Sequence, residues 1–288
     1  MPHIGTLNEL RVVRETYSGV YLDAGELGEI LLPQQYVPTH CRTGDRLTVF
    51  LYTDSEDRPI ATTQSPLAMA GDFARLKVVA ETPVGAFLDW GLPKDLLVPF
   101  REQNTPMKKG RAYIVRVYLD ERSQRVVASA KLDRFLSDTT TDLHAGQEVE
   151  LFVCTQTTLG RKVIINRTHW GLLHSSDIFQ PLHSGHRLTG FVKTVRADGK
   201  IDVCLHKPGY AKVSDISAII LDALEQHGGQ IPVTDRSTPE SIRQWFGVSK
   251  KTYKKALGAL YKKKLVTLTD AQVSLNRNSR KQTAVTGP

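Results

Sequence analysis

The chain has 288 residues, of which 40% are hydrophobic and 24% charged, and its formal net charge is +8. The length indicates two to four compact domains, and the composition excludes a low-complexity or mainly disordered protein. Three scattered cysteines without a CxxC pair support neither a disulfide framework nor a thiolate zinc site, and we expect a cytoplasmic protein without signal peptide or membrane segment.

The first 205 residues contain one unit that is repeated three times. Gly5, Gly19 and Gly44 recur at an offset of 66 residues and again at a further offset of 75. Apolar positions keep the same register, and the polar segments EDRP, RSQR and ADGK stand at corresponding places in the three units. Apolar residues alternate with polar ones between these turns, which predicts half-buried strands joined by hairpins.

The pattern in each unit predicts five short strands within about 60 residues. Five strands are too few to bury the two faces of an open sheet separately. Closing the sheet into a small Greek-key barrel of the OB type solves this problem. We therefore predict a multi-domain protein with a mainly β N-terminal part, made of three tandem five-stranded OB-fold barrels, and a C-terminal α+β winged-helix domain. The predicted barrels span residues 1–64, 65–132 and 146–207, with a polar linker at 133–145.

Three fragments resemble the RNA-binding barrel that is repeated in ribosomal protein S-one. They are GAFLDWGLPKDLLVP (85–99), GRAYIVRVYLDERSQRVVASAK (110–131) and GLLHSSDI (171–178). The resemblance implies that bases stack on the second and third strands while cations follow the phosphates. The candidate nucleic-acid-binding residues that it implies are Tyr21, Phe87 and Lys162 on the second strands, His174 on the third strand, and Asp120, Arg125 and Lys200 at the hairpins.

The copies depart from this pattern at several places. Ser18, Val84 and Leu159 stand where the motif has an aromatic residue. Trp90 is a nearby substitute that could stack on a base, although a contact between domains is an equal alternative. Residues 1–206 also carry 24 Lys and Arg against 24 Asp and Glu. Together with these departures, this balance leads us to expect that at least one barrel acts as a spacer or protein contact, and we assign that role to the first.

After the barrels the apolar period changes from 2 to 3.6 residues, which predicts three helices. The first ends at His227, the second begins after the capping residue Thr238, and the third begins after Ser249. In the third helix, Tyr253, Leu257, Leu260 and Tyr261 are expected to face inward. Two short strands around 269–271 complete a winged helix at 213–275, and residues 276–288 are expected to form a flexible basic tail.

The whole positive excess lies in this C-terminal part, where residues 207–288 hold 14 Lys and Arg against 6 Asp and Glu (14 − 6 = +8). A solvated face is the alternative, but the scarcity of acids favours phosphate contact. The outer face lacks the Arg, Asn and Gln side chains that read base edges, so sequence-specific promoter binding is not supported. The candidate phosphate-binding residues of the third helix are Lys250, Lys251, Lys254, Lys255 and Lys262.

The segment FGVSKKTYKKALGALYKKKLV (246–266), together with the order of the domains, resembles the bacterial family called conserved virulence factor B, or CvfB. This resemblance implies a regulatory protein that binds RNA through the barrels and the winged helix together, and we expect that RNA to be single-stranded. Two alternatives stay open: an adaptor that binds ribosome or RNA polymerase components, and a DNA-binding regulator acting through the winged helix. The sequence names neither the RNA nor its base preference.

Catalytic motifs are missing from the sequence, which has no Walker loop, nucleophile elbow or HExxH segment. Four histidines between 169 and 186 lack a carboxylate or thiol partner at ligand spacing. We therefore expect no enzyme, no cofactor, no metal and no membrane partner, and we expect a monomer.

Overall fold

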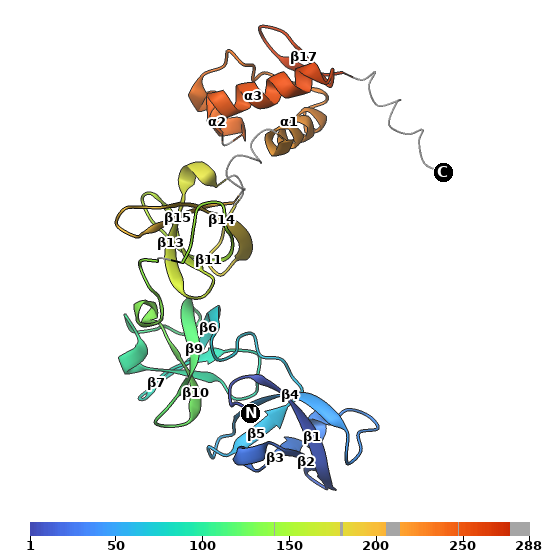
Figure 1. Ribbon diagram of the computed structural model, residues 1–288, viewed down its shortest axis with the longest axis vertical. Coiled ribbons are helices and arrows are strands. Elements are labelled where there is room, and N and C mark those ends of the chain that lie inside the picture. Colours follow the sequence, from blue (N-terminus) through green and yellow to red (C-terminus); the bar gives the residue numbers. More distant parts are fainter. Residues whose placement is uncertain (141, 179–180, 206–213, 247, 277–288) are drawn as a thin grey trace. The chain divides into compact units, whose positions relative to one another are not determined.

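The structure of the chain is a computed structural model that describes residues 1–140, 142–178, 181–205, 214–246 and 248–276 (Figure 1). The chain divides into two compact units, residues 1–137 and 138–288. The first unit holds two five-stranded sheets. The second holds one five-stranded sheet and the helical domain.

The first sheet is a closed barrel with the strand order β1-β2-β3-β5-β4. It consists of β1 (Leu7–Thr16), β2 (Gly19–Asp23), β3 (Glu29–Pro33), β4 (Arg46–Thr53) and β5 (Pro59–Thr62), with 3₁₀ turns at Gly25–Leu27 and Gln34–Tyr36. The third sheet has the same order and is also closed. Its strands are β11 (Glu148–Gln156), β12 (Gly160–Ile165), β13 (His169–His174), β14 (Arg187–Val195) and β15 (Ile201–Cys204), with a 3₁₀ turn at Ser175–Asp177.

The second sheet has the strand order β10-β9-β6-β7-β8, and its end strands β8 and β10 lie side by side, so that it approaches the predicted barrel without the ladder that would close it. It consists of β6 (Phe73–Thr82), β7 (Gly85–Asp89), β8 (Leu96–Pro99), β9 (Ala112–Asp120) and β10 (Arg125–Ser129), with 3₁₀ turns at Phe100–Glu102 and Leu132–Phe135. The other two sheets close through a short parallel ladder, β3 with β5 and β13 with β15, whereas β8 and β10 form no such ladder. The residues between β7 and β8 contact the first barrel.

The repeated apolar positions form the cores of the three sheets. All twelve of the following side chains are fully buried: Val12, Val78 and Val153; Leu22, Leu88 and Val163; Leu32, Val98 and Leu173; Leu51, Val117 and Val192. The first strand of each sheet also has a bulge directly after the valine of this series. Because a bulge bends and twists a strand, β1, β6 and β11 can each pair with a neighbour on both sides while the sheet curls.

The helical domain contains the three predicted helices and a small sheet. The helices are α1 (Ser214–Gln226), α2 (Pro239–Phe246) and α3 (Lys250–Lys262), and the strands β16 (Gln230–Ile231), β17 (Val266–Leu268) and β18 (Val273–Leu275) pair in the order β16-β18-β17. The Oγ of Ser249 accepts a hydrogen bond from the backbone N–H of Thr252, as predicted for a helix cap. Strand β16 has only two residues, too few to give a detectable period in the sequence.

One residue of α3 was wrongly expected to face inward. Tyr253 is buried and its hydroxyl donates a hydrogen bond to the carbonyl of Val233 at 2.7 Å, but Tyr261 is 55% exposed. Ala256 belongs to the buried face in its place. The reason is geometric, because eight residues turn a helix by two turns and about 80° more, which carries Tyr261 away from the side occupied by Tyr253.

The domain boundaries that the sequence predicts remain a proposal. Residues 206–207 of the third barrel, residue 213 of the winged helix and residues 277–288 of the tail lie outside the described residues. Part of the predicted linker is a 3₁₀ turn, in which Arg134 donates to both carboxylate oxygens of Glu102 at 2.8 Å. Within the described part of the chain, no helix has the length and apolar character needed to cross a membrane.

Candidate nucleic-acid interface

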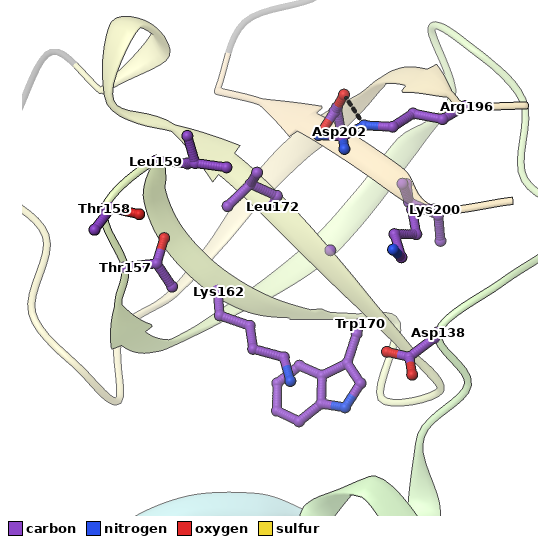
Figure 2. Close-up of a pocket in the computed structure, with 12 residues that line it drawn as sticks. Asp138, Thr157, Thr158, Leu159, Lys162, Trp170, Leu172, Arg196, Lys200 and Asp202 are labelled. Atoms are coloured by element: carbon purple, nitrogen blue, oxygen red, sulfur yellow. Dashed lines mark hydrogen bonds and ion pairs between the residues drawn. The ribbon is translucent and has the colours of Figure 1, made fainter. Parts of the chain in front are cut away.

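The third barrel has a hollow of about 300 Å³ on the outer face of β12, β13 and β15 (Figure 2). Its walls are mostly apolar and its rim carries three cations. The lining residues are Asp138, Thr157, Thr158, Leu159, Lys162, Trp170, Gly171, Leu172, Arg196, Lys200, Ile201 and Asp202. Apolar walls with a few polar groups are the usual features of a site for a small planar ligand.

The indole of Trp170 lies under the side chain of Lys162 in this pocket. The Lys162 Nζ is 3.7 Å from the centre of the indole, and Trp170 is 7% exposed. An ammonium group over an aromatic face is attracted by the ring quadrupole. Lys162 therefore lies at the predicted ligand-facing position and covers an aromatic surface that the sequence prediction missed.

The position of Trp170 could have been found from strand alternation. Side chains two residues apart on a strand point to the same face. His174 was placed on the ligand face by its motif, so Leu172 and Trp170 belong to that face as well. The fully buried Leu173 between them points into the barrel, as this alternation requires.

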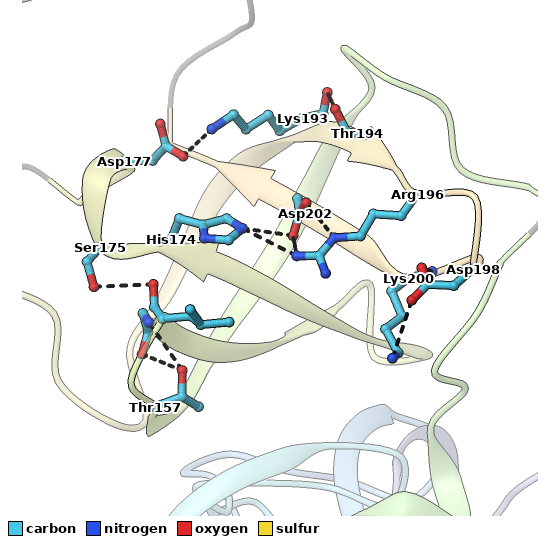
Figure 3. Close-up of polar contacts among 12 residues, drawn as sticks. Thr157, His174, Ser175, Asp177, Lys193, Thr194, Arg196, Asp198, Lys200 and Asp202 are labelled. Carbon is cyan, nitrogen blue, oxygen red and sulfur yellow. Dashed lines mark hydrogen bonds and ion pairs between the residues drawn. The ribbon is translucent and has the colours of Figure 1, made fainter.

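A half-buried carboxylate orients two nitrogen-bearing side chains, His174 and Arg196, beside the pocket (Figure 3). His174 Nε2 lies 3.0 Å from Asp202 Oδ1, and Arg196 Nε donates to Asp202 Oδ2 at 2.8 Å. Burial disfavours ionisation of Asp202, but its hydrogen bonds to Arg196 and His174 outweigh burial, so the pKa of this carboxyl lies below its ordinary value. Asp202 thus stays ionised and holds both side chains in fixed positions.

Lys200 extends this positive rim. Its Nζ lies 3.4 Å from Asp198, and both side chains are exposed, so the pair is weak and screened by water. Leu159 is also exposed on the same rim. The predicted residues Lys162, His174 and Lys200 therefore belong to one face of the third barrel.

The first barrel has a corresponding hollow of about 320 Å³, but its aromatic ring is covered. The guanidinium carbon of Arg14 lies 3.5 Å from the centre of the Tyr21 ring, and the Arg14 Nε donates to Glu29 at 2.8 Å. Asp54 and Arg58, which also line this hollow, pair with each other. The predicted stacking position Tyr21 is thus occupied by a side chain of the same barrel.

The second sheet places Phe87 and Asp120 in different surroundings. Phe87 is half-buried on β7. Asp120 accepts hydrogen bonds from the hydroxyl and the backbone N–H of Ser123 and lies 3.7 Å from Arg101. The hydroxyl bond from Ser123 is the main reason why the pKa of Asp120 is lowered. Asp120 therefore stabilises its own hairpin.

Trp90 lies inside the first unit and not on a ligand face. It is 2% exposed, its ring meets the edge of Phe50 from the first barrel at 5.6 Å, and its Nε1 donates to the Lys94 carbonyl at 2.6 Å. Of the two alternatives for Trp90, the contact between domains fits this burial. A base cannot stack on a ring that is covered on all sides.

Arg125 belongs to the same contact between the first two sheets. Its guanidinium pairs with Asp57 of the β4–β5 hairpin, and Lys94 donates to the carbonyl of Asp54. Lys94 also lies 3.8 Å from Asp57. The carboxylate of Asp57 thus partly neutralises two cations of the second sheet, one of which was predicted to contact RNA.

The lysines of α3 lie mainly on its exposed side. Lys251, Lys254, Lys255 and Lys262 are exposed, while Lys250 is half-buried and donates to a backbone carbonyl at 3.4 Å. The Lys254 Nζ is 3.5 Å from Asp235. This side of the helix is therefore strongly positive, with one acidic neighbour near its N-terminal half.

The histidines in the third barrel form no metal centre among the residues that the structure describes, where no group of three or more His, Cys, Asp or Glu could hold an ion. The rings of His183 and His186 contact each other at 5.2 Å.

Two family models match the chain, one at each end. The S1 domain matches residues 4–64, which form the first barrel, and the CvfB-like winged helix domain matches residues 218–275. Neither describes a catalytic domain. The match at the first barrel is consistent with the resemblance that the sequence carries most clearly in the second and third copies.

Several relatives are similar over nearly the whole chain. A protein of Bacillus subtilis known as uncharacterized protein YitL is 29% identical over 88% of this chain and 87% of its own length. Conserved virulence factor B of Staphylococcus epidermidis is 22% identical over 95% of both chains, and that of Staphylococcus aureus is 22% identical over 95% of this chain and 94% of its own. A solved multidomain protein with nucleic acid binding domains from Streptococcus pneumoniae is 22% identical, with a TM-score of 0.42 over 94% of this chain and 98% of its own.

The order of the domains and the match at the C-terminal domain indicate the same family. The winged helix fits the model named for this family, and the relatives that carry the family name match over 95% of this chain. The C-terminal domain is therefore a CvfB-like winged helix, and nearly the whole chain is similar to proteins named conserved virulence factor B.

Proposed function

We propose that the protein binds single-stranded RNA, with bases held at the third barrel and phosphates held by lysines of the winged helix. The observation that carries this proposal is the pocket in which Lys162 covers Trp170, beside His174 and Arg196, which Asp202 holds in place. We assign a regulatory role to this binding from the family resemblance.

The chemistry of the pocket suits an unpaired base. A base can enter between Leu172 and Leu159 and reach the indole if the Lys162 ammonium moves from the ring to a phosphate. Aromatic stacking accepts any base, and cations at the rim follow the backbone. In duplexes the base faces are already stacked, so this pocket favours single strands.

The charge on the winged helix supports affinity more than sequence preference. Lysines contact phosphates as point charges, whereas bidentate Arg, Asn and Gln contacts read bases. We therefore expect binding that weakens steeply with salt and depends little on sequence.

The first barrel is proposed as a spacer or protein contact. Residues 1–64 carry nine Asp and Glu against five Arg and no Lys, a net charge of −4. Its stacking position is covered by Arg14, which also pairs with Glu29. Both features oppose a phosphate track along this barrel.

The deciding experiment is crosslinking in cells, followed by sequencing of bound RNA and mass spectrometry of bound proteins. RNA adducts at peptides of the third barrel and α3 are the expected result. Abundant protein adducts without RNA would favour an adaptor, and recovered DNA would favour a DNA-binding regulator.

Two double variants separate the stacking and phosphate parts of the proposal. The double variant Phe87→Ala with His174→Ala should weaken RNA binding. The double variant Lys254→Ala with Lys255→Ala should make the slope of log K against log salt concentration shallower by about 2, roughly one for each lost phosphate contact. Fluorescence anisotropy with a labelled single-stranded RNA at several salt concentrations measures both. Unchanged RNA affinity in both double variants would contradict the proposal.

Arg125 and Lys200 form a natural matched pair, since they occupy the same place in successive repeats. Arg125→Ala should change RNA affinity by less than about twofold because its guanidinium is held by Asp57. Lys200→Ala should lower affinity by roughly 3- to 10-fold and reduce the salt slope by about 1. Equal losses in the two variants would mean that Asp57 does not occupy Arg125.

A further inference from the structure

The outer face of α3 has a glycine at its centre that the fold does not require. Glycine is among the least favourable residues in a helix interior because it gains most chain entropy on unfolding. Gly258 is not among the residues with positive φ, and a Cβ at this position would meet nothing within 4 Å. Neither backbone conformation nor packing explains why this position lacks a side chain.

The neighbours of Gly258 on the helix surface are cationic and aromatic. Residues three and four positions away lie beside a helical residue on the same face. For Gly258 these are Lys254, Lys255, Tyr261 and Lys262. All four are exposed, and Tyr261 is 55% exposed although its ring is large and mostly apolar.

Few acidic side chains neutralise the positive charge of these four neighbours. Lys254 lies 3.5 Å from Asp235, and both side chains are about half exposed. Within the described part of the chain, Lys255 and Lys262 have no ion pair with an acidic side chain. Lysine is depleted at the centres of protein–protein interfaces, so the charge selects a polyanion over a protein surface.

We propose that Gly258 is the point at which a sugar–phosphate strand comes closest to α3. Without a Cβ, the helix backbone itself can approach the strand, which brings the ammonium groups of Lys254, Lys255 and Lys262 onto neighbouring phosphates. The phenol of Tyr261 packs against the sugar beside them. This inference rests on the winged-helix part of the proposed function and adds the contact residue that sets its geometry.

Substituting Gly258 separates a binding role from a structural one, because the two roles predict opposite signs. Gly258→Ala in the full chain should raise the melting temperature of the winged helix by a few degrees, since alanine favours the helix. The same variant should bind a fluorescein-labelled single-stranded RNA roughly 3- to 10-fold more weakly, comparable to the loss of a phosphate contact. Gly258→Leu should weaken binding further.

Ala259→Gly is the matched control, because Ala259 is the next residue along the helix and is not one of the four side chains that surround Gly258. It should lower the melting temperature and leave RNA affinity unchanged. Parallel titrations with duplex RNA and duplex DNA show which kind of strand reaches the helix, since all three probes share the sugar–phosphate chemistry. A loss in Gly258→Ala with at least one of these probes supports the inference.

The double variant Lys254→Ala with Lys255→Ala distinguishes a failure of the proposed RNA binding by the winged helix from a failure of the close approach at Gly258. If it binds every probe as tightly as the unmodified protein, the winged-helix part of the proposed function fails, and the inference with it. If it binds weakly while Gly258→Ala and Gly258→Leu keep full affinity, the close approach at Gly258 is overturned and the lysine contacts remain.

Discussion

Replacing Gly160 with alanine is expected to unfold the third barrel, with a loss of more than about 3 kcal/mol in its free energy of unfolding. Gly160 begins β12 with φ +155°, and a Cβ there would overlap the carbonyl oxygen of Leu173 and lie 2.8 Å from the Cα of His174. These atoms are backbone of the paired strand β13 and cannot rotate away. The substitution therefore forces the two strands apart.

Gly146→Ala is the control for this prediction. Gly146 also has a positive φ, +87°, but a Cβ there would meet nothing within 4 Å. Only conformational strain remains, which costs about 1–2 kcal/mol. Hydrogen exchange measured by mass spectrometry on β11–β15 reports each loss locally, and a Gly160→Ala barrel as protected as the Gly146→Ala barrel would contradict the geometry.

The glycine register explains why so much of the fold could be predicted from the sequence. Gly19, Gly85 and Gly160 each begin a second strand where a Cβ would overlap the facing strand, so the same requirement recurs in every copy. The buried valines and leucines follow strand alternation, which is a local property. Strands, hairpins, helices and the winged helix were therefore accessible to pattern reasoning.

The parts that the sequence could not supply depend on contacts between copies. Trp90 and Arg125 have the residue types of a nucleic-acid site, but a neighbouring barrel covers one and pairs with the other. Nothing local to β7 or β10 indicates that neighbour. The missing ladder between β8 and β10 has no local signal either, since these strands lie side by side as their counterparts do in the other two sheets.

Charge predicts a phosphate surface on the winged helix but does not predict how the side chains of that surface are arranged. Seven lysines between 250 and 264 indicate a phosphate surface. The exposed position of Tyr261 depends on the exact turn of the helix, where an error of one residue rotates a side chain by about 100°. Apolar character alone therefore misplaced this ring.

Trp170→Leu is expected to weaken binding of single-stranded RNA by roughly 5- to 150-fold, which corresponds to the loss of about 1–3 kcal/mol of stacking on one base. The indole is 7% exposed and lies under Lys162, so the ring contributes to packing as well as to the pocket floor. Leucine keeps most of the apolar contact with the barrel but has no aromatic face. A loss of affinity without unfolding therefore reports stacking.

Trp170→Phe and Lys162→Ala complete the test of the Trp170 ring. Phenylalanine retains an aromatic face and should keep most of the affinity, so the order Trp, Phe, Leu indicates stacking and not volume. Lys162→Ala uncovers the ring but removes a cation, so affinity should fall at low salt, change little at high salt and become less sensitive to salt. If Trp170→Leu binds as tightly as the unmodified protein while its barrel stays protected from exchange, the base does not reach this ring. The site must then lie elsewhere, either at His174 on the third barrel or at Phe87 on the second sheet.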